Sequence, residues 1–97
     1  MPWTWDSDKD RANQRKHSLS FETAQLVFDD PLAMSRMDAS SSSEERWHTV
    51  GVVAGVTLFV VHTAPEDAGN SEEPAGRIIS ARKATARERR AYEESEF

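Results

Sequence analysis

The sequence predicts a small α+β domain in which helices pack on an antiparallel sheet. Apolar residues recur at helical spacing between Phe21 and Phe28, and three β-rich runs follow one another between Arg46 and Lys83. A helix-capping sequence comes directly after the last of these runs. A chain of 97 residues suffices for one domain, so we expect a single domain over residues 1–97.

The N-terminal segment predicts a short strand followed by a polar helix. Trp3-Thr4-Trp5 is β-prone and short enough for a strand at the edge of a sheet. Asp8 is a candidate N-cap for a helix over Lys9 to His17, because an Asp side chain can accept from the free N–H groups of the first turn. This helix has few apolar residues, so we expect it on the surface.

A second helix follows, with Ser20 as its candidate N-cap. Its apolar residues share one face, which we expect to pack on the core: Phe21, Ala24, Val27 and Phe28. Pro31 disfavours helical geometry in the residue before it, so the helix is expected to end by Asp30.

Two β-rich runs, Arg46 to Val53 and Val56 to Thr63, are separated by Ala54-Gly55, a spacing typical of a β-hairpin. The second run is apolar on both faces, as in a central strand. Arg77 to Lys83 predicts a third antiparallel strand. The expected sheet is this meander with the short N-terminal strand added.

The last predicted element is a helix from Ala86 to about Glu94. Thr85 and Glu88 have the spacing of a capping box, which satisfies two N–H groups of the first turn. Between the predicted elements, residues 36–45 contain four consecutive serines and residues 64–76 are acidic, so both are expected to be flexible loops.

The composition excludes several classes of function. The chain has no cysteine, which rules out a disulfide framework, a thiolate zinc site and a cysteine nucleophile. The three histidines are dispersed, so we expect neither a metal site nor another cofactor. The longest apolar stretch is far shorter than the roughly 20 residues that span a bilayer, and the N-terminus lacks the order of a signal peptide. We therefore expect a cytoplasmic protein without a membrane partner.

The net charge is −5, but one segment of the chain is basic. Residues 75–92 contain six Lys and Arg residues and a single acidic residue, whereas the remaining chain has a net charge of −10. Local potential decides what a surface attracts, so this block is a candidate site for an anionic partner.

Several short motifs, in order, resemble the BrnT family of toxins. The N-terminal Trp-Asp and the R-A-N-x-R-K-H run at residues 11–17 are similar to the opening of that family. Ser20-Phe21-Glu22, the Phe-Asp-Asp-Pro run at residues 28–31 and Glu45-Arg46-Trp47 match its middle part. The block from Ile78 to Thr85, followed by Glu88-Arg89-Arg90 and Tyr92, is similar to its C-terminal part.

This resemblance implies a RelE-like fold and an endoribonuclease that is the toxin of a type II toxin–antitoxin system. The implied partners are RNA and a cognate antitoxin with a ribbon-helix-helix DNA-binding domain, similar to BrnA; DNA would be contacted only through that complex. Two other interpretations stay open. In the first, the chain is a non-catalytic subunit that acts with its antitoxin as an operon co-repressor. In the second, it is an unrelated α+β interaction domain.

Cleavage of RNA through its own 2′-OH needs a base, a cation for the phosphate and an acid for the leaving oxygen. Arg82, at the end of a predicted strand, and Arg46, in the neighbouring hairpin, are the candidates for the phosphate, because a guanidinium binds phosphate through two N–H groups. Lys16 and His17 are the candidates for proton transfer, since a helix C-terminus favours the cationic imidazole. The alternatives are ion pairs of Arg82 with Glu88 or Glu93, pairs of Arg46 with Glu44 or Glu45, and a capping role for His17.

The basic block supplies the candidate RNA-binding residues: Arg77, Lys83, Arg87, Arg89, Arg90 and Tyr92. The cations would follow the RNA backbone, and Tyr92 would stack on a base. Their alternatives are a solvated helix face or antitoxin docking for the cations, and packing on the sheet for Tyr92. His62 lies on the apolar face of the central strand and is interpreted as a packed histidine; His48 is an even weaker candidate for catalysis.

Overall fold

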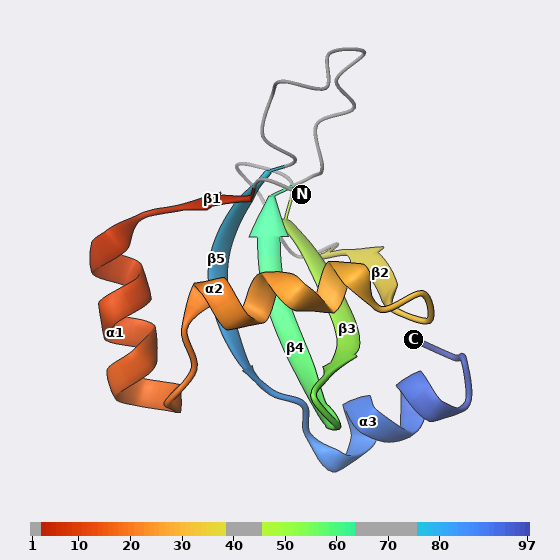
Figure 1. Ribbon diagram of the computed structural model, residues 1–97. Helices are drawn as coiled ribbons and strands as arrows, with labels where there is room; N and C mark the ends of the chain where they lie inside the picture. The colour runs from red at the N-terminus through yellow and green to blue at the C-terminus, as the bar shows by residue number, and fades with distance from the viewer. Residues whose placement is uncertain (1–2, 39–45, 64–75) are drawn as a thin grey trace.

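The computed structural model describes residues 3–38, 46–63 and 76–97 and is built around one five-stranded sheet in the order β1-β5-β4-β3-β2 (Figure 1). The strands are β1 (Thr4–Trp5), β2 (Met34–Met37), β3 (Arg46–Val53), β4 (Val56–Thr63) and β5 (Arg77–Lys83). Strand β1 runs parallel to β5, and the other neighbours are antiparallel.

The β3–β4–β5 meander has the bounds that the sequence predicts. Ala54 and Gly55 connect β3 to β4 with φ values of 50° and 82°. A two-residue turn with positive φ at both positions follows the right-handed twist of the strands, as in a type I′ turn. This local geometry fixes the register in which Val53 pairs with Val56.

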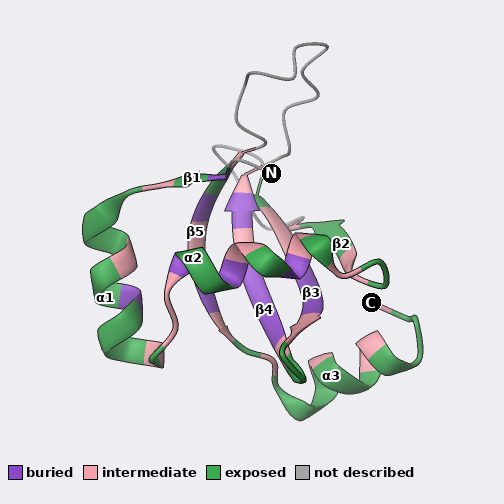
Figure 2. Ribbon diagram, viewed as in Figure 1, coloured by how far each residue is buried: buried purple, intermediate pink, exposed green. Residues whose placement is uncertain are grey.

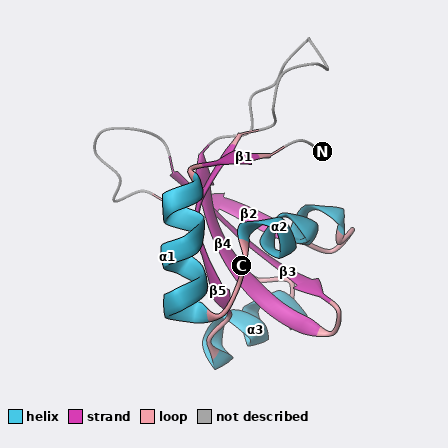
Figure 3. Ribbon diagram, turned by 60° about the vertical axis from the view of Figure 1, so that its left-hand side comes forward, coloured by secondary structure: helices cyan, strands magenta, loops and turns pink. Residues whose placement is uncertain are grey.

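The helices are α1 (Ser7–His17), α2 (Phe21–Ala24), its 3₁₀ continuation η1 (Gln25–Asp29) and α3 (Ala86–Glu93). Helix α2 and η1 cross one face of the sheet, α1 lies beside β5, and α3 lies near the end where the β3–β4 hairpin turns (Figures 1 and 3). The capping box of α3 is confirmed, because Thr85 and Glu88 each accept from the N–H of the other. Ser20 is confirmed as the N-cap of α2.

The core lies between the sheet and α2–η1 (Figure 2). The predicted stripe is confirmed: Phe21, Ala24 and Val27 are fully buried, and Phe28 packs against them. From the sheet they meet residues of β4 and β5: Leu58, Val60, Ile78 and Ala81. Burial of these apolar surfaces is the main stabilising term in a domain of this size.

His62 is packed in this core, as the sequence predicts, and has no exposed surface. Trp3 and Phe28 stack at 4.0 Å, and each presents its ring to His62 at about a right angle. The Nδ1 of His62 donates to the carbonyl of Thr63, so Nε2 accepts from the hydroxyl of Thr49 at 2.6 Å. Burial lowers the pKa of His62 to about 4, which keeps this imidazole neutral near pH 7.

The side chain of Asn13 hydrogen-bonds helix α1 to the outer edge of β5. The Nδ2 of Asn13 donates to the carbonyl of Ala81 at 2.8 Å, and its Oδ1 accepts from the Ala81 N–H at 3.2 Å. The amide thus takes the place of a neighbouring strand beyond the short β1, which protects an otherwise open edge.

The structure corrects several expectations. Residues 36 and 37 belong to β2, not to a loop, because they pair with β3, and the hydroxyls of the neighbouring Ser35 and of Thr49 lie 2.6 Å apart. Residues 39–45 and 64–75 of the two predicted loops lie outside the described residues. The sheet is not wholly antiparallel, because β1 is parallel to β5. Helix α1 begins at Ser7, with Asp6 as its N-cap in place of Asp8, and α2 tightens into η1 after one turn.

Candidate functional site

The sheet face opposite α2–η1 gathers polar and aromatic side chains. Along β4, Phe59 and Val61 alternate with the core residues, and strand pairing places residues of β2, β3 and β5 beside them on the same face. One row across the sheet consists of Met34, Val50, Phe59 and Arg82. The adjacent row consists of Arg36, His48, Val61 and Ser80.

Phe59 is the centre of this face and is only 7% exposed. The guanidinium carbon of Arg82 lies 4.3 Å from its ring centroid, and the His48 ring lies 4.9 Å from it at a tilt. The ring of Phe97 meets Phe59 edge to face at 6.3 Å, and Arg36 lies over Phe97 at 4.6 Å. We call Arg36, His48, Phe59, Arg82 and Phe97 the Phe59 cluster.

Arg82 is held in place by α3. Its Nη1 and Nη2 donate to the two carboxylate oxygens of Glu88 at 2.8 and 3.0 Å. This hydrogen bonding raises the pKa of Arg82. Burial alone would raise the pKa of Glu88, but the bonds from Arg82 and from the Thr85 N–H lower it, so both groups are charged. The pair that the sequence offered as the alternative for Arg82 therefore exists, and it fixes the guanidinium above Phe59.

His48 has an acidic partner at the other side of the cluster. Its Nε2 lies 3.4 Å from Oδ2 of Asp38, and both side chains are largely buried. An imidazole beside a carboxylate is a common arrangement for proton transfer, because the carboxylate stabilises the protonated ring. Since His48 and Arg82 flank the same ring, a ligand on Phe59 would be within reach of both.

Arg46 shares this face with Arg82 but does not lie beside it. Arg46 pairs with Thr63, and Arg82 with Phe59, so the two positions are two strands apart. They are also four residues apart along β4, which is roughly 13 Å at about 3.3 Å per residue. This spacing favours contacts of the two side chains with different groups over a shared contact with one phosphate.

Lys16 and His17 lie elsewhere, at the C-terminal end of α1. They line a groove of about 310 Å³ between α1 and β5, which Ser80 and Arg82 also line. The guanidinium of Arg82, however, extends over β4, away from α1. The carbonyl of Gln14 at this helix end accepts from the N–H of Ser18, which has a left-handed φ of 56°.

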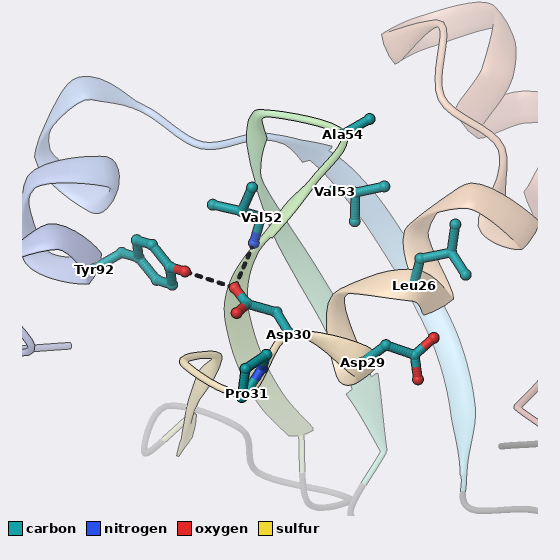
Figure 4. Close-up of a pocket in the computed structure, with 8 residues that line it drawn as sticks. All are labelled: Leu26, Asp29, Asp30, Pro31, Val52, Val53, Ala54 and Tyr92. Atoms are coloured by element: carbon teal, nitrogen blue, oxygen red, sulfur yellow. Dashed lines mark hydrogen bonds between the residues drawn. The ribbon is translucent and has the colours of Figure 1, made fainter.

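The predicted RNA-binding cations are all exposed, at the two ends of β5 and along α3: Arg77, Lys83, Arg87, Arg89 and Arg90. Tyr92 has a different environment. Its hydroxyl donates to Oδ2 of Asp30 at 2.6 Å, and the same oxygen accepts from the N–H of Val52 (Figure 4). The bond to Asp30 raises the pKa of Tyr92, and the same bond lowers the pKa of Asp30.

Asp30, Tyr92 and Val52 border a second hollow, of about 490 Å³, which Leu26 and the hairpin tip complete (Figure 4). The described residues that line it include no cation that would attract a phosphate, in contrast to the Phe59 cluster. Within the described segments, no three His, Asp or Glu side chains are grouped as a metal site. In the same part of the chain, no helix is long and apolar enough to cross a membrane.

The comparison with known families decides the family of this chain. Residues 5–88 match the model of the ribonuclease toxin BrnT of type II toxin–antitoxin systems. The chain belongs to the BrnT family. BrnT toxins of type II systems have a cognate antitoxin, which gives this protein a protein partner. The matched BrnT region includes Arg36, His48, Arg82 and Glu88 and ends before Phe97. No curated protein matches the chain.

Sequence reasoning selected Arg82 but missed Arg36 and gave His48 little weight. Neither residue stands in a motif, and their approach to Phe59 depends on the register across β2, β3 and β4. The one local signal is alternation, since His48 and Arg46 occupy the same face of a predicted strand.

Proposed function

We propose that the chain is an endoribonuclease that cleaves RNA at the Phe59 cluster by attack of the 2′-OH on the adjoining phosphate, without a metal. The family match supports ribonuclease activity in general. The observation that carries the choice of site is that Arg82 and His48 flank one buried ring on the face away from the helices.

Removal of the 2′-OH proton and stabilisation of the phosphate each have a candidate residue in the Phe59 cluster. His48 takes the proton of the 2′-OH, and the carboxylate of Asp38 stabilises the resulting imidazolium. Arg82 stabilises the charge that develops on the phosphorane. The 2′-oxygen forms a bond to phosphorus as the bond to the 5′-oxygen breaks. A solvent water gives a proton to the leaving 5′-oxygen, and His48 returns its proton to solvent, which leaves a 2′,3′-cyclic phosphate and a 5′-hydroxyl.

Arg82 can bind phosphate without first leaving Glu88. Among the described residues, its bonds to Glu88 and to the Lys83 carbonyl use three of the five guanidinium N–H donors. The remaining two donors are available to a phosphate on Phe59. Glu88 then has the role of a positioning residue that orients the guanidinium.

The other cations serve the RNA outside the cleaved bond. We propose that Arg46 contacts a flanking phosphate and that Lys83, Arg77 and the three arginines of α3 guide the backbone. Lys16 and His17 stay predictions for proton transfer, to be tested against His48. We propose a cytoplasmic location, where RNA would be available as the substrate.

The test is incubation of the purified protein with end-labelled RNA, followed by analysis of the product ends. Fragments with 2′,3′-cyclic phosphate and 5′-hydroxyl ends are the expected products. Fragments with 3′-hydroxyl and 5′-phosphate ends would contradict attack by the 2′-OH. Arg82→Gln is expected to lose cleavage while it still binds the antitoxin.

The salt bridge between Arg82 and Glu88 also favours a second candidate function, because it partly neutralises the main phosphate-binding cation. In that case the chain is a non-catalytic subunit that acts with its antitoxin as an operon co-repressor. We propose a ribbon-helix-helix antitoxin as the DNA-binding partner in either case. Operator binding by the complex without any RNA cleavage by the free chain would favour this second function.

A further inference from the structure

The segment after α3 folds back toward Phe59. Ser95 has a left-handed φ of 58°, its N–H donates to the carbonyl of Tyr92, and the Glu96 N–H donates to that of Ala91. These two bonds form a Schellman motif, which reverses the chain at a helix C-terminus. The reversal places Phe97 against Phe59.

Phe97 packs against Arg36 and Phe59. Its ring lies 4.6 Å from the guanidinium carbon of Arg36 and meets Phe59 edge to face. An arginine over a flat ring, with a second aromatic ring beside it, is also how proteins hold an unstacked base. Arg82 and His48 contact the same Phe59, so a base in this position would be next to the groups proposed for cleavage.

The end of α3 and the residues after it are acidic, whereas the preceding turns of α3 are basic. Glu93, Glu94 and Glu96 bring three negative charges to the end of α3, whose preceding turns contain Arg87, Arg89 and Arg90. A phosphate backbone that approaches Arg82 would be repelled by these carboxylates and attracted by the arginines. Displacement of residues 94–97 would remove the Phe97 ring together with the charges of Glu94 and Glu96.

We propose that Arg36 and Phe59 form a nucleobase-binding subsite that Phe97 fills in the free protein, so that RNA must displace Phe97 to bind. This inference rests on the proposed ribonuclease function, since it names the position of a base relative to the cleaved phosphate. It makes residues 94–97 an internal competitor of RNA. The competitor is held by a turn whose only left-handed residue is not glycine.

The test is a binding measurement that does not depend on cleavage. The probe is a short fluorescent 2′-O-methyl RNA, which lacks the attacking hydroxyl, and its affinity is measured for each variant by fluorescence anisotropy. Phe97→Ala is expected to bind the probe about threefold or more tightly, because the ring no longer competes for Arg36 and Phe59. Equal or weaker binding by Phe97→Ala would overturn the proposal.

Two further variants separate displacement from a structural role. Ser95→Gly relieves the left-handed strain, so the turn becomes more stable and probe affinity is expected to fall. Arg36→Gln in the Phe97→Ala background is expected to cancel the gain in affinity. If Ser95→Gly binds the probe more tightly, or if Arg36→Gln leaves the gain intact, the subsite is assigned wrongly.

The same set distinguishes this inference from the proposed function. Tighter probe binding by Phe97→Ala, in a protein that cleaves no RNA, would contradict ribonuclease activity and support the subsite. Cleavage by the wild-type chain with no change in probe affinity among the variants would support ribonuclease activity and contradict the subsite. Thermal unfolding of each variant verifies that the fold is intact.

Discussion

The two guanidinium nitrogens Nη1 and Nη2 of Arg82 bind the two carboxylate oxygens of Glu88 at 2.8 and 3.0 Å. Such a two-point pair fixes direction as well as distance, so the guanidinium is oriented before any phosphate arrives. The same carboxylate closes the N-terminal cap of α3. Glu88 thereby connects the sheet face of the candidate site to the helix that carries most of the predicted RNA-binding cations.

We predict that Glu88→Gln binds RNA more tightly, by about threefold at low salt, because the charge of Arg82 is no longer neutralised. The amide oxygen can still accept from the Thr85 N–H, and the ion pair is partly exposed, so the loss of stability should stay below about 1 kcal/mol. Affinity is measured by fluorescence anisotropy. Glu22→Gln changes the net charge equally on α2, which covers the opposite face of the sheet; an equal gain from that variant would attribute the effect to net charge alone.

The three exposed arginines of α3 should govern the salt dependence of binding. Arg87→Gln, Arg89→Gln and Arg90→Gln are each expected to weaken RNA binding. In each variant the negative slope of the log association constant against log salt should become less steep, by about 0.7 for each phosphate that is no longer neutralised. The slope is obtained from binding curves at several NaCl concentrations. An unchanged slope in all three variants would assign these arginines to another partner, such as the antitoxin.

The stability of the domain should fall as the pH falls from about 6.5 to 4. The pKa of His62 is about 4 in the folded chain and 6.5 as its ordinary value, so the unfolded chain takes up a proton first. The contribution of the neutral His62 to the free energy of unfolding is then fully present above pH 6.5, and roughly 3 kcal/mol of it is lost by pH 4. Urea unfolding at a series of pH values measures this loss. In this range, His62→Gln should have a smaller slope of the unfolding free energy against pH, whereas His17→Gln should have the slope of the wild type.

Asn13 should contribute more to stability than a surface position on a polar helix normally does. Asn13→Ala leaves the buried N–H and carbonyl of Ala81 without their partner, at an expected cost of about 2–3 kcal/mol. Gln14→Ala, on the exposed side of α1, is the matched control and should change stability by less than about 0.5 kcal/mol. Chemical denaturation measures both. Similar values for the two variants would show that Asn13 does not hold α1 on β5.

The elements that local chemistry determines could be predicted from the sequence. The β3–β4 hairpin follows from alternation and from a two-residue connection, and the start of α3 follows from Thr85 and Glu88. Strand β2 escaped prediction because three of its four residues are exposed, so no apolar alternation marks it. The parallel pairing of β1 joins Thr4 to Arg77, and no local pattern encodes a contact across so many residues.

The candidate site was predictable only in part for the same reason. Arg82 was found through its motif, whereas Arg36 and His48 reach Phe59 only once β2, β3 and β4 are in register. The position of Phe97 depends on a reversal at Ser95, a residue type that seldom adopts the left-handed conformation. Lys16 and His17 are candidates because they lie at the end of a helix. That position does not indicate whether their side chains lie on the same face of the sheet as Arg82.

The central claim is that RNA is cleaved at the Phe59 cluster, and the single-turnover cleavage rate of His48→Gln against that of His17→Gln tests it most directly. The account predicts that His48→Gln cleaves labelled RNA at least about 100-fold more slowly than the wild type, as expected for the loss of a general base, with RNA affinity little changed. His17→Gln should keep a rate close to that of the wild type. A wild-type rate in His48→Gln, together with a loss of cleavage in His17→Gln, would place the reaction in the groove beside α1 and contradict the account.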